Sequence, residues 1–171
     1  MIAPTLHTRR LTLGPVSDAH CEAFIAFCAT EESRFLGGPS NADDAWVGVA
    51  MHAGQWVLRG YGVFWASDRV TGTPVGRVGI FHPGWRAEPE LSWVIYPEFQ
   101  HQGFATEAAL AARHWAYESL GFGPLMSLID PANPASERVA LRLGAQSEGP
   151  HRTDVAHVVN RWRHPGPESR A

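Results

Sequence analysis

The sequence predicts a single α/β domain over residues 1–171, in which helices flank a mixed β-sheet. Three observations predict this class. The length of 171 residues suits one domain, and 44% hydrophobic against 18% charged residues suffice for a hydrophobic core. Segments rich in β-branched and aromatic residues alternate with segments of helical periodicity. Glycine and proline separate these segments, and no repeat or interdomain linker is evident.

We expect the elements in the order strand, two helices, three strands, helix, strand, helix, strand. Leu6–Leu13 reads as the first strand, which a Gly-Pro pair ends. The first helix begins at Ser17 or Asp18, either of which can cap it, and runs to about Ala29. After a loop, the second helix is expected over Ala45–Leu58, because its apolar residues repeat at helical spacing.

Three strands follow in close order and predict an antiparallel meander. Their segments are aromatic or β-branched, and the turns between them contain glycine and proline. We expect the strands over Tyr61–Ala66, Val75–Phe81 and Glu90–Tyr96.

The C-terminal part is expected to add two helices and two strands. Ala105–Leu120 is rich in Ala, Leu and Glu and is the strongest helix of the sequence. A short strand over Leu125–Ile129 and a short helix over Ser136–Leu143 come next, before a last strand over Val155–Trp162. The segment from His164 to Ala171 is expected to be a frayed tail.

The charged residues exclude several classes of function. The net charge of -3 gives no basic field for nucleic acid. All 14 basic residues are arginine, which excludes a Schiff-base lysine and the phosphate-binding lysines of kinases and P-loop proteins. No apolar run approaches the ~20 residues of a membrane span, and the first residues lack the apolar segment of a signal peptide. We therefore expect neither a nucleic-acid nor a membrane partner.

The cysteines and histidines indicate a reducing compartment and no metal. Cys21 and Cys28 lie about 10 Å apart along the first predicted helix. A disulfide needs Cα atoms within about 7 Å, so these two cannot pair, and a cytoplasmic location fits best. The nine histidines include no pair at the spacing of a metal site.

A turn with one glycine joins the strand Glu90–Tyr96 to the helix Ala105–Leu120. Such a turn exposes backbone N–H groups at the positive end of the helix dipole, where a pyrophosphate can bind. Gly103 would let the backbone approach that ligand closely. Glycine at a helix start is also common in ordinary turns, and neither a dinucleotide fingerprint nor a P-loop is present. The turn alone is therefore weak evidence for phosphate binding.

Several motifs occur together in an order that resembles a known family. Gln100, Gly103 and Ala105 match (R/Q)-x-x-G-x-(G/A), the signature of the GNAT superfamily of N-acetyltransferases. The words TRRLTL, HQGFATEAA and NPASERVALRLGA resemble the branch that contains the ribosomal-protein N-terminal acetyltransferases (RimJ/RimL-like). The resemblance covers most of Thr8 to Ala145.

The resemblance implies a mixed, mostly antiparallel sheet that splays open beside the strand Glu90–Tyr96, with acetyl-CoA in the splay. Backbone groups there would pair with the pantetheine: Trp93, Val94 and Ile95. The turn, whose first signature position is Gln100, would hold the pyrophosphate through backbone N–H groups. These N–H groups belong to Gln102, Gly103, Phe104, Ala105 and Thr106. Asn133 would bind the pantetheine arm. Arg138 or Arg142 would meet the 3′-phosphate, although either could be an ordinary exposed helix residue.

The acceptor amine must lose a proton, so the enzyme needs a general base. Glu90, at the head of the signature strand, is the candidate base, acting through water; the alternative is a solvated strand-end carboxylate, and neighbouring Glu88 could take either role. Ser136 matches the serine that would protonate the departing thiolate, and it could instead cap its helix. No tyrosine lies between Asn133 and Ala145 to serve as that acid. The oxyanion donor would be a backbone N–H at Val94 or Ile95.

These residues support three hypotheses. The leading one is an N-acetyltransferase that moves the acetyl group of acetyl-CoA to an amine, either a protein N-terminus or a small molecule. The second is a degenerate acyl-CoA sensor without turnover, and the third is a structural α/β domain. Aromatic and apolar residues are expected to form the substrate walls: Phe35, Leu36, Trp46 and Trp85. Dimers are common among the proteins it resembles, so a homodimer stays open.

Overall fold

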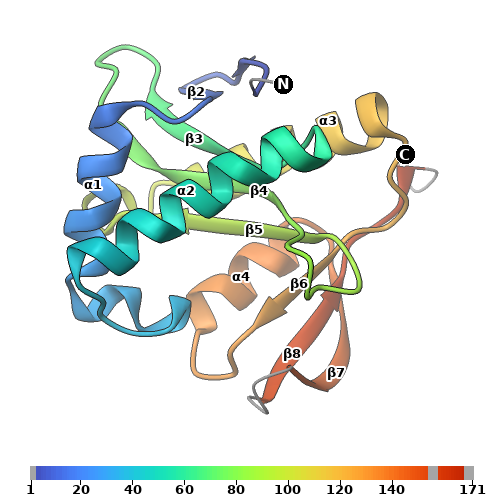
Figure 1. Ribbon diagram of the computed structural model, residues 1–171. Helices are drawn as coiled ribbons and strands as arrows, with labels where there is room; N and C mark the ends of the chain where they lie inside the picture. The colour runs from blue at the N-terminus through green and yellow to red at the C-terminus, as the bar shows by residue number, and fades with distance from the viewer. Residues whose placement is uncertain (1–2, 154–157, 168–171) are drawn as a thin grey trace.

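A computed structural model describes residues 3–153 and 158–167 of the chain. Eight strands form one sheet in the order β1-β2-β3-β4-β5-β6-β8-β7 (Figure 1). Every neighbouring pair is antiparallel except β5 and β6, which are parallel. The predicted fold class, a mixed and mostly antiparallel sheet flanked by helices, is confirmed.

The elements have the following bounds. The strands are β1 (Leu6–His7), β2 (Leu11–Gly14), β3 (Val63–Asp68), β4 (Pro74–Phe81), β5 (Glu90–Ile95), β6 (Met126–Ile129), β7 (Gln146–Arg152) and β8 (Val158–Arg163). The α-helices are α1 (Asp18–Cys28), α2 (Ala42–Arg59), α3 (Phe104–Leu120) and α4 (Pro134–Arg142). Short 3-10 helices cover η1 (Glu31–Leu36) and η2 (Pro97–Phe99).

Helices cover the sheet on both faces. In Figure 1, α1 and α2 cross the near face and α3 runs behind the sheet. Aromatic side chains of α1 pack with β3 and with the residue just after β5 in the near core: Phe24, Phe27, Trp65 and Tyr96. The far core joins the alanine-rich face of α3 to the other face of the strands: Leu13, Val78, Ile80, Leu91, Ala108, Ala112 and Ala116. Because alanine is small, α3 can lie close to the sheet.

The parallel pair β5 and β6 diverges almost at once. The only register pair between these strands among the described residues is Glu90 with Met126, whereas β4 and β5 pair over six positions. In Figure 1, β6, β8 and β7 run down and away from β5, with α4 beside the opening. The expected splay beside the signature strand is therefore present, and it begins at Glu90.

The N-terminal part differs from expectation in three places. The first strand is broken in two, because the Thr8 N–H donates to the Leu11 carbonyl and closes a turn (2.9 Å). The second helix begins at Ala42 rather than Ala45, since the Asn41 side chain accepts from the Asp44 N–H and caps it (2.9 Å). The expected loop before it begins with the 3-10 helix η1.

The C-terminal part contains an edge strand that the sequence did not predict. β7 has no alternation of apolar and polar residues, and it is a strand because it pairs with β8 from Gln146 to Arg152. The last strand was expected from Val155, but residues 154–157 lie outside the described part of the chain, and β8 is described from Val158. Within the described residues, no helix is long and apolar enough to cross a membrane.

His164, the first residue of the segment expected to be frayed, is instead 1% exposed. The Ser127 hydroxyl donates to the Leu91 carbonyl (2.6 Å) and lies 2.9 Å from His164 Nε2. Because the hydroxyl has one proton, Nε2 must be the donor in the second contact. This chain of contacts ties the C-terminal segment to β5 and β6 next to the point where they diverge. Residues 168–171 lie outside the described part of the chain.

We expect His164 to make the protein less stable in acid. Burial, with help from Arg113 and Arg163, lowers its pKa from 6.5 to about 3. As the pH falls below about 6.5, His164 binds a proton in the unfolded chain but stays neutral in the folded protein. The free energy of unfolding therefore drops by up to about 1.4 kcal/mol per pH unit. His164→Gln keeps a donor for Ser127 and cannot titrate, so its stability should fall less between about pH 7.5 and about pH 5 in urea unfolding.

Glu90, whose pKa is raised to about 7, acts with the opposite sign, but it is present in both proteins and cancels in the comparison. Equal losses of stability in His164→Gln and the wild type would contradict this account.

Candidate active site

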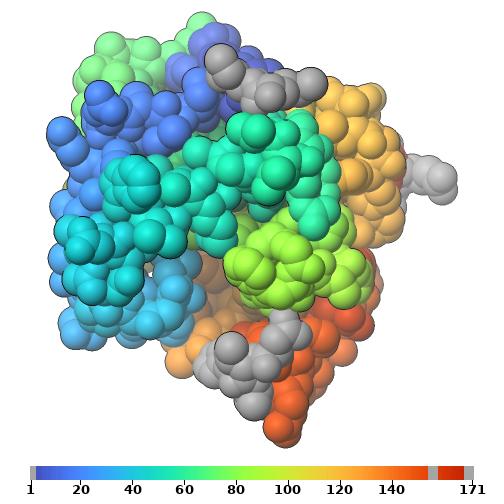
Figure 2. Space-filling model, viewed as in Figure 1, coloured from blue at the N-terminus to red at the C-terminus, as the bar shows by residue number. Residues whose placement is uncertain are grey.

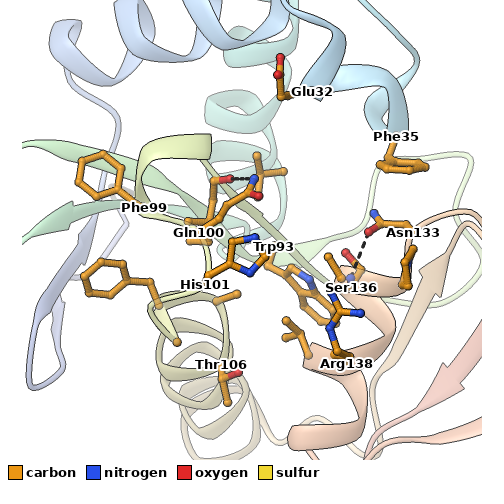
Figure 3. Close-up of a pocket in the computed structure, with 18 of the residues that line it drawn as sticks. Glu32, Phe35, Trp93, Phe99, Gln100, His101, Thr106, Asn133, Ser136 and Arg138 are labelled. Carbon is orange, nitrogen blue, oxygen red and sulfur yellow. Dashed lines mark hydrogen bonds between the residues drawn. The ribbon is translucent and has the colours of Figure 1, made fainter.

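A cavity of about 440 Å³ lies where β5 and β6 have separated. Its size is that of a small-molecule or cofactor site. β5, the turn before α3, α4 and η1 form its walls, and Figure 3 shows their side chains around it. It is lined by ten of the residues expected to bind the cofactor: Trp93, Val94, Ile95, Gln100, Gly103, Phe104, Ala105, Thr106, Asn133 and Arg138.

The turn before α3 has the form that a phosphate group requires. His101 and Gly103 both have a positive φ (60° and 81°), so the backbone curls there before the helix begins at Phe104. The first N–H groups of a helix have no partner within the helix and face the cavity side of such a turn. The Thr106 hydroxyl is buried and has no hydrogen-bond partner among the described residues. The turn therefore fits an anionic group of a ligand such as acetyl-CoA.

Arg10, which sequence analysis did not single out, contacts this turn from the position just before β2. Its Nη1 donates to the Gln102 carbonyl (2.9 Å), and its guanidinium lies over the Phe104 ring (4.3 Å). Its Nε and its backbone N–H both donate to the Glu107 carboxylate (2.7 and 2.8 Å). The only signal for this contact in the sequence was that TRRLTL, which contains Arg10, and HQGFATEAA, which contains Glu107, occur together. Arg10 holds the first turn of α3 against the N-terminal strands.

The backbone of β5 presents alternate residues to the opening. The Tyr96 N–H donates to Val75 of β4, so Val94, two residues earlier, also points its backbone toward β4. The Leu91 and Ile95 carbonyls accept from Ser127 and Gln100 on the other side (2.6 and 2.9 Å). Trp93 and Ile95 therefore direct their backbone groups to the cavity.

A second cavity of about 110 Å³ adjoins the first one. Both cavities are lined by the same five residues: Phe35, Leu36, Trp93, Asn133 and Ser136. Only the smaller one is also lined by the acidic residues Glu90 and Asp130. The Asp130 carboxylate accepts from the Ala132 N–H (2.7 Å), whereas Glu90 Oε2 has no hydrogen-bond partner among the described residues.

Glu90 is buried and not solvated, so the expectation of a strand-end carboxylate in water is wrong. It is 8% exposed, and burial raises its pKa to about 7. Three groups lower the pKa of Glu90: Arg86, whose Nη2 lies 3.6 Å from Oε2, the Leu128 N–H and Arg77. The effect of burial is larger than theirs, so the pKa is raised. A carboxyl group with a pKa near neutrality can exchange a proton at physiological pH.

A hydrogen bond joins Asn133 and Ser136 at the start of α4. The Asn133 side chain accepts from the Ser136 backbone N–H (3.1 Å), as Figure 3 shows. Asn133 is thus the cap of the helix, and the expectation that Ser136 caps it is wrong. The Ser136 side chain lines both cavities.

Four expected residues lie away from the cavities. Gln102 is exposed and donates from its side chain to the Glu98 carbonyl (3.1 Å). Trp46 and Trp85 are 56% and 61% exposed and line neither cavity, so the expectation that they form substrate walls is wrong. Glu88, the alternative base, is occupied by ion pairs with Arg161 and Arg163 (3.5 and 2.8 Å).

Sequence analysis did not predict several residues that line the larger cavity. Phe27 and Phe99 line the larger cavity from α1 and η2, and their aromatic character did not separate them from core residues. The charged lining residues Glu32 and Arg34 come from η1, which was expected to be partly a loop. Within the described residues, no three His, Cys, Asp or Glu side chains gather at a distance suited to a metal ion.

Comparison with known proteins identifies the family. The acetyltransferase (GNAT) domain matches residues 10–146. The uncharacterized N-acetyltransferase YoaA of Bacillus subtilis (strain 168) is 28% identical over 150 residues, which cover 85% of each chain. An acetyltransferase from Agrobacterium tumefaciens str. C58 is 32% identical with a TM-score of 0.88, covering 96% of this chain and 95% of that one.

A more distant structure shares the fold. It is a spermidine N-acetyltransferase from Vibrio cholerae in complex with CoA and spermine, with 14% identity and a TM-score of 0.73 over 92% of this chain and 96% of that one. The match to the GNAT domain covers most of the sequence and agrees with the cleft geometry. The chain belongs to the GNAT acetyltransferase family, and it is an acyl-CoA-dependent acetyltransferase.

We expect Gly103→Val to weaken acetyl-CoA binding about tenfold or more. Gly103 has φ of 81° at the start of α3, and a left-handed backbone costs other residues about 1–2 kcal/mol, so valine would unwind the turn. Isothermal titration calorimetry with acetyl-CoA measures the change.

Gly121→Val is the matched control, because Gly121 has the same backbone strain (φ 67°) at the opposite end of α3. It should lower stability and leave the acetyl-CoA affinity unchanged. Unchanged affinity in Gly103→Val would show that the turn does not hold the phosphates.

Proposed function

We propose that this protein transfers an acetyl group from acetyl-CoA to a primary amine, which attacks the thioester directly. One observation carries the proposal: the two cavities meet at Trp93 and Ser136, and a buried carboxylate with a raised pKa lines the smaller one. The larger cavity would hold acetyl-CoA and the smaller one the acceptor amine. The thioester would then lie at their junction.

The charges of the two cavities support this division. Three arginines and one glutamate line the larger cavity: Arg34, Arg138, Arg142 and Glu32. Glu90 and Asp130 line the smaller one, and no arginine is among its described lining residues. Phosphates are attracted to the first set and an ammonium group to the second. Arg138 or Arg142 would meet the phosphate of the adenosine end.

Glu90 is proposed as the general base. An ammonium group must lose its proton before nitrogen can attack the acetyl carbon. Glu90 would take that proton directly or through a water molecule. Its pKa of about 7 lies close to the 7.7–8.0 of an α-amino group, so transfer is nearly balanced and the carboxylate is ionised at neutral pH about half of the time.

The carbonyl and the leaving group have candidate partners at the junction. Attack forms the C–N bond and pushes electrons onto the carbonyl oxygen, and the C–S bond then breaks. The Ile95 N–H, which faces the cavity, is the proposed oxyanion donor, in preference to Val94. Ser136 would donate a proton to the thiolate and recover one from solvent.

The acceptor is proposed to be a protein N-terminus or a small-molecule amine. The RimJ/RimL-like motifs favour the first, and a neighbour of the same fold that is named as a spermidine acetyltransferase illustrates the second. Cys21 and Cys28 are unpaired thiols, which supports a cytoplasmic setting.

We expect Glu90→Gln to lower kcat/KM about 100-fold near neutral pH and less as the pH rises. In the wild type the rate should rise as Glu90 ionises through a pKa of about 7. The variant loses that rise, and its rate should follow the free fraction of the amine, which increases toward about pH 10. Steady-state kinetics over this pH range measure both profiles.

Glu88→Gln is the control, because Glu88 is the neighbouring carboxylate held by Arg161 and Arg163. It should keep the wild-type profile. An equal loss at every pH in Glu90→Gln would contradict the base role. If the wild type binds acetyl-CoA but transfers the acetyl group to no amine, the hypothesis of an acyl-CoA sensor without turnover would replace this proposal.

A further inference from the structure

One side chain of the turn before α3 sits on a backbone conformation that side chains rarely adopt. His101 has φ of 60°, and among residues 3–153 and 158–167 it is the only residue other than glycine with a positive φ. This left-handed region is unfavourable for a residue that has a Cβ atom. Such residues cluster at ligand sites, where the surrounding structure imposes the conformation. Because His101 lines the larger cavity, its conformation points to a contact with the ligand of that cavity.

The two glutamines that flank His101 are both bonded back to the protein. Gln100 donates from its side chain to the Ile95 carbonyl (2.9 Å), and Gln102 donates to the Glu98 carbonyl (3.1 Å). The exposed His101 ring has no hydrogen-bond or ion-pair partner within the described part of the chain. Figure 3 shows the ring among the side chains that line the cavity. Its ring nitrogens are therefore available to a ligand.

His101 is also the only residue of the turn that can carry a positive charge. Residues 97–106 (PEFQHQGFAT) contain neither Arg nor Lys. The N–H groups at the start of a helix are neutral donors to a bound anion, and a charged imidazole forms a stronger hydrogen bond than they do. Arg10 reaches the turn, but its guanidinium already binds the Gln102 carbonyl and the Glu107 carboxylate (2.9 and 2.7 Å).

We propose that the His101 side chain binds the pyrophosphate of CoA and is protonated in that complex. The ring N–H donates to a pyrophosphate oxygen, beside the backbone N–H groups of the turn. Histidine is the side chain that ordinarily gains its charge between about pH 8 and pH 5. Because binding of the proton and binding of the anion favour each other, CoA should bind more tightly as the pH falls through this range. The inference rests on the proposed function in one respect, that the larger cavity holds the cofactor, and it does not depend on the transfer step.

Other charged groups lie at the cavity or the turn and act on the same ligand. They are Glu32 and Arg34 of η1, Arg138 and Arg142 of α4, Glu98 of η2, and Arg10 with Glu107. Figure 2 shows η1, in light blue, next to α4, in orange, below α2. Glu90, in the smaller cavity, has a pKa of about 7 and changes its charge in the same pH range. All these groups are shared by the wild type and a variant at position 101, so the ratio of the two Kd values cancels their contributions.

Calorimetric titration of the whole protein with CoA at about pH 6 and about pH 8 tests the contact. Asparagine tolerates a positive φ and carries no charge, so His101→Asn removes the imidazole and keeps the turn. Its Kd should exceed that of the wild type about tenfold at pH 6 and about twofold at pH 8. A role of the backbone alone would change the affinity equally at both pH values. Repeating the titrations in buffers of different ionisation enthalpy measures the protons taken up, and the wild type should take up more than the variant.

Three further variants separate the ring, the charge and the loss of a histidine. Glycine adopts this φ freely but has no ring, so His101→Gly should also lose more affinity at pH 6 than at pH 8. His101→Arg carries a permanent charge and should bind CoA equally well at both pH values. His114→Gln is the matched control, because the exposed His114 of α3 lines neither cavity, and it should keep the wild-type Kd at both pH values. Circular dichroism confirms that each variant is folded.

Titration with 3′-dephospho-CoA locates the contact on the ligand. This compound keeps the pyrophosphate and lacks the 3′-phosphate, so His101→Asn should weaken its binding by the same factor as that of CoA. A factor near one with 3′-dephospho-CoA, or a His101→Asn variant that binds CoA as the wild type does at pH 6, would overturn the inference and leave acetyl transfer standing. If the wild type binds no CoA, the proposed function and this inference both fail.

Discussion

The divergence of β5 from β6 after one paired position is the constraint on which the site depends. A strand in the middle of a sheet normally has its backbone groups paired on both sides. Beyond Glu90, the cavity-facing backbone of β5 at Trp93 has no strand beside it, and a ligand or water must satisfy it. The far sides of the opening are closed by the turn before α3 and by α4. The same divergence thus creates both the binding edge and the space.

The opening is held at its apex and at its rim by residues from distant parts of the sequence. At the apex, His164 and Ser127 join the C-terminal segment to Leu91 of β5. At the rim, Arg10, which lies just before β2, binds Glu107 and the turn before α3. Preorganised donors need such support, because a cofactor gains little from groups that must first be ordered. The turn before α3 therefore depends on contacts with residues that are far from it in sequence.

Local sequence predicted the elements whose signals are local. The alanine-rich α3, the meander β3–β5 and the glycine turn all have such signals, and the resemblance supplied the splay. β7 could not be predicted, because its pairing with β8 makes it a strand and its own residues lack strand periodicity. The contacts of Arg10, the burial of Glu90 and the burial of His164 arise from packing between distant segments. At α4, the sequence offered Ser136 as a possible cap, and the structure shows Asn133 in that place, a residue of equally suitable type.

The central claim is that the opening between β5 and β6 is an acetyl-CoA site. Calorimetric titration of the whole protein with acetyl-CoA, alongside free CoA, tests it most directly. The account predicts one site per chain with a Kd on the order of micromolar, and binding of free CoA as well, because the turn and the arginines contact the shared part of both ligands. No heat of binding at millimolar acetyl-CoA would contradict the account, since the cleft would then not hold its cofactor.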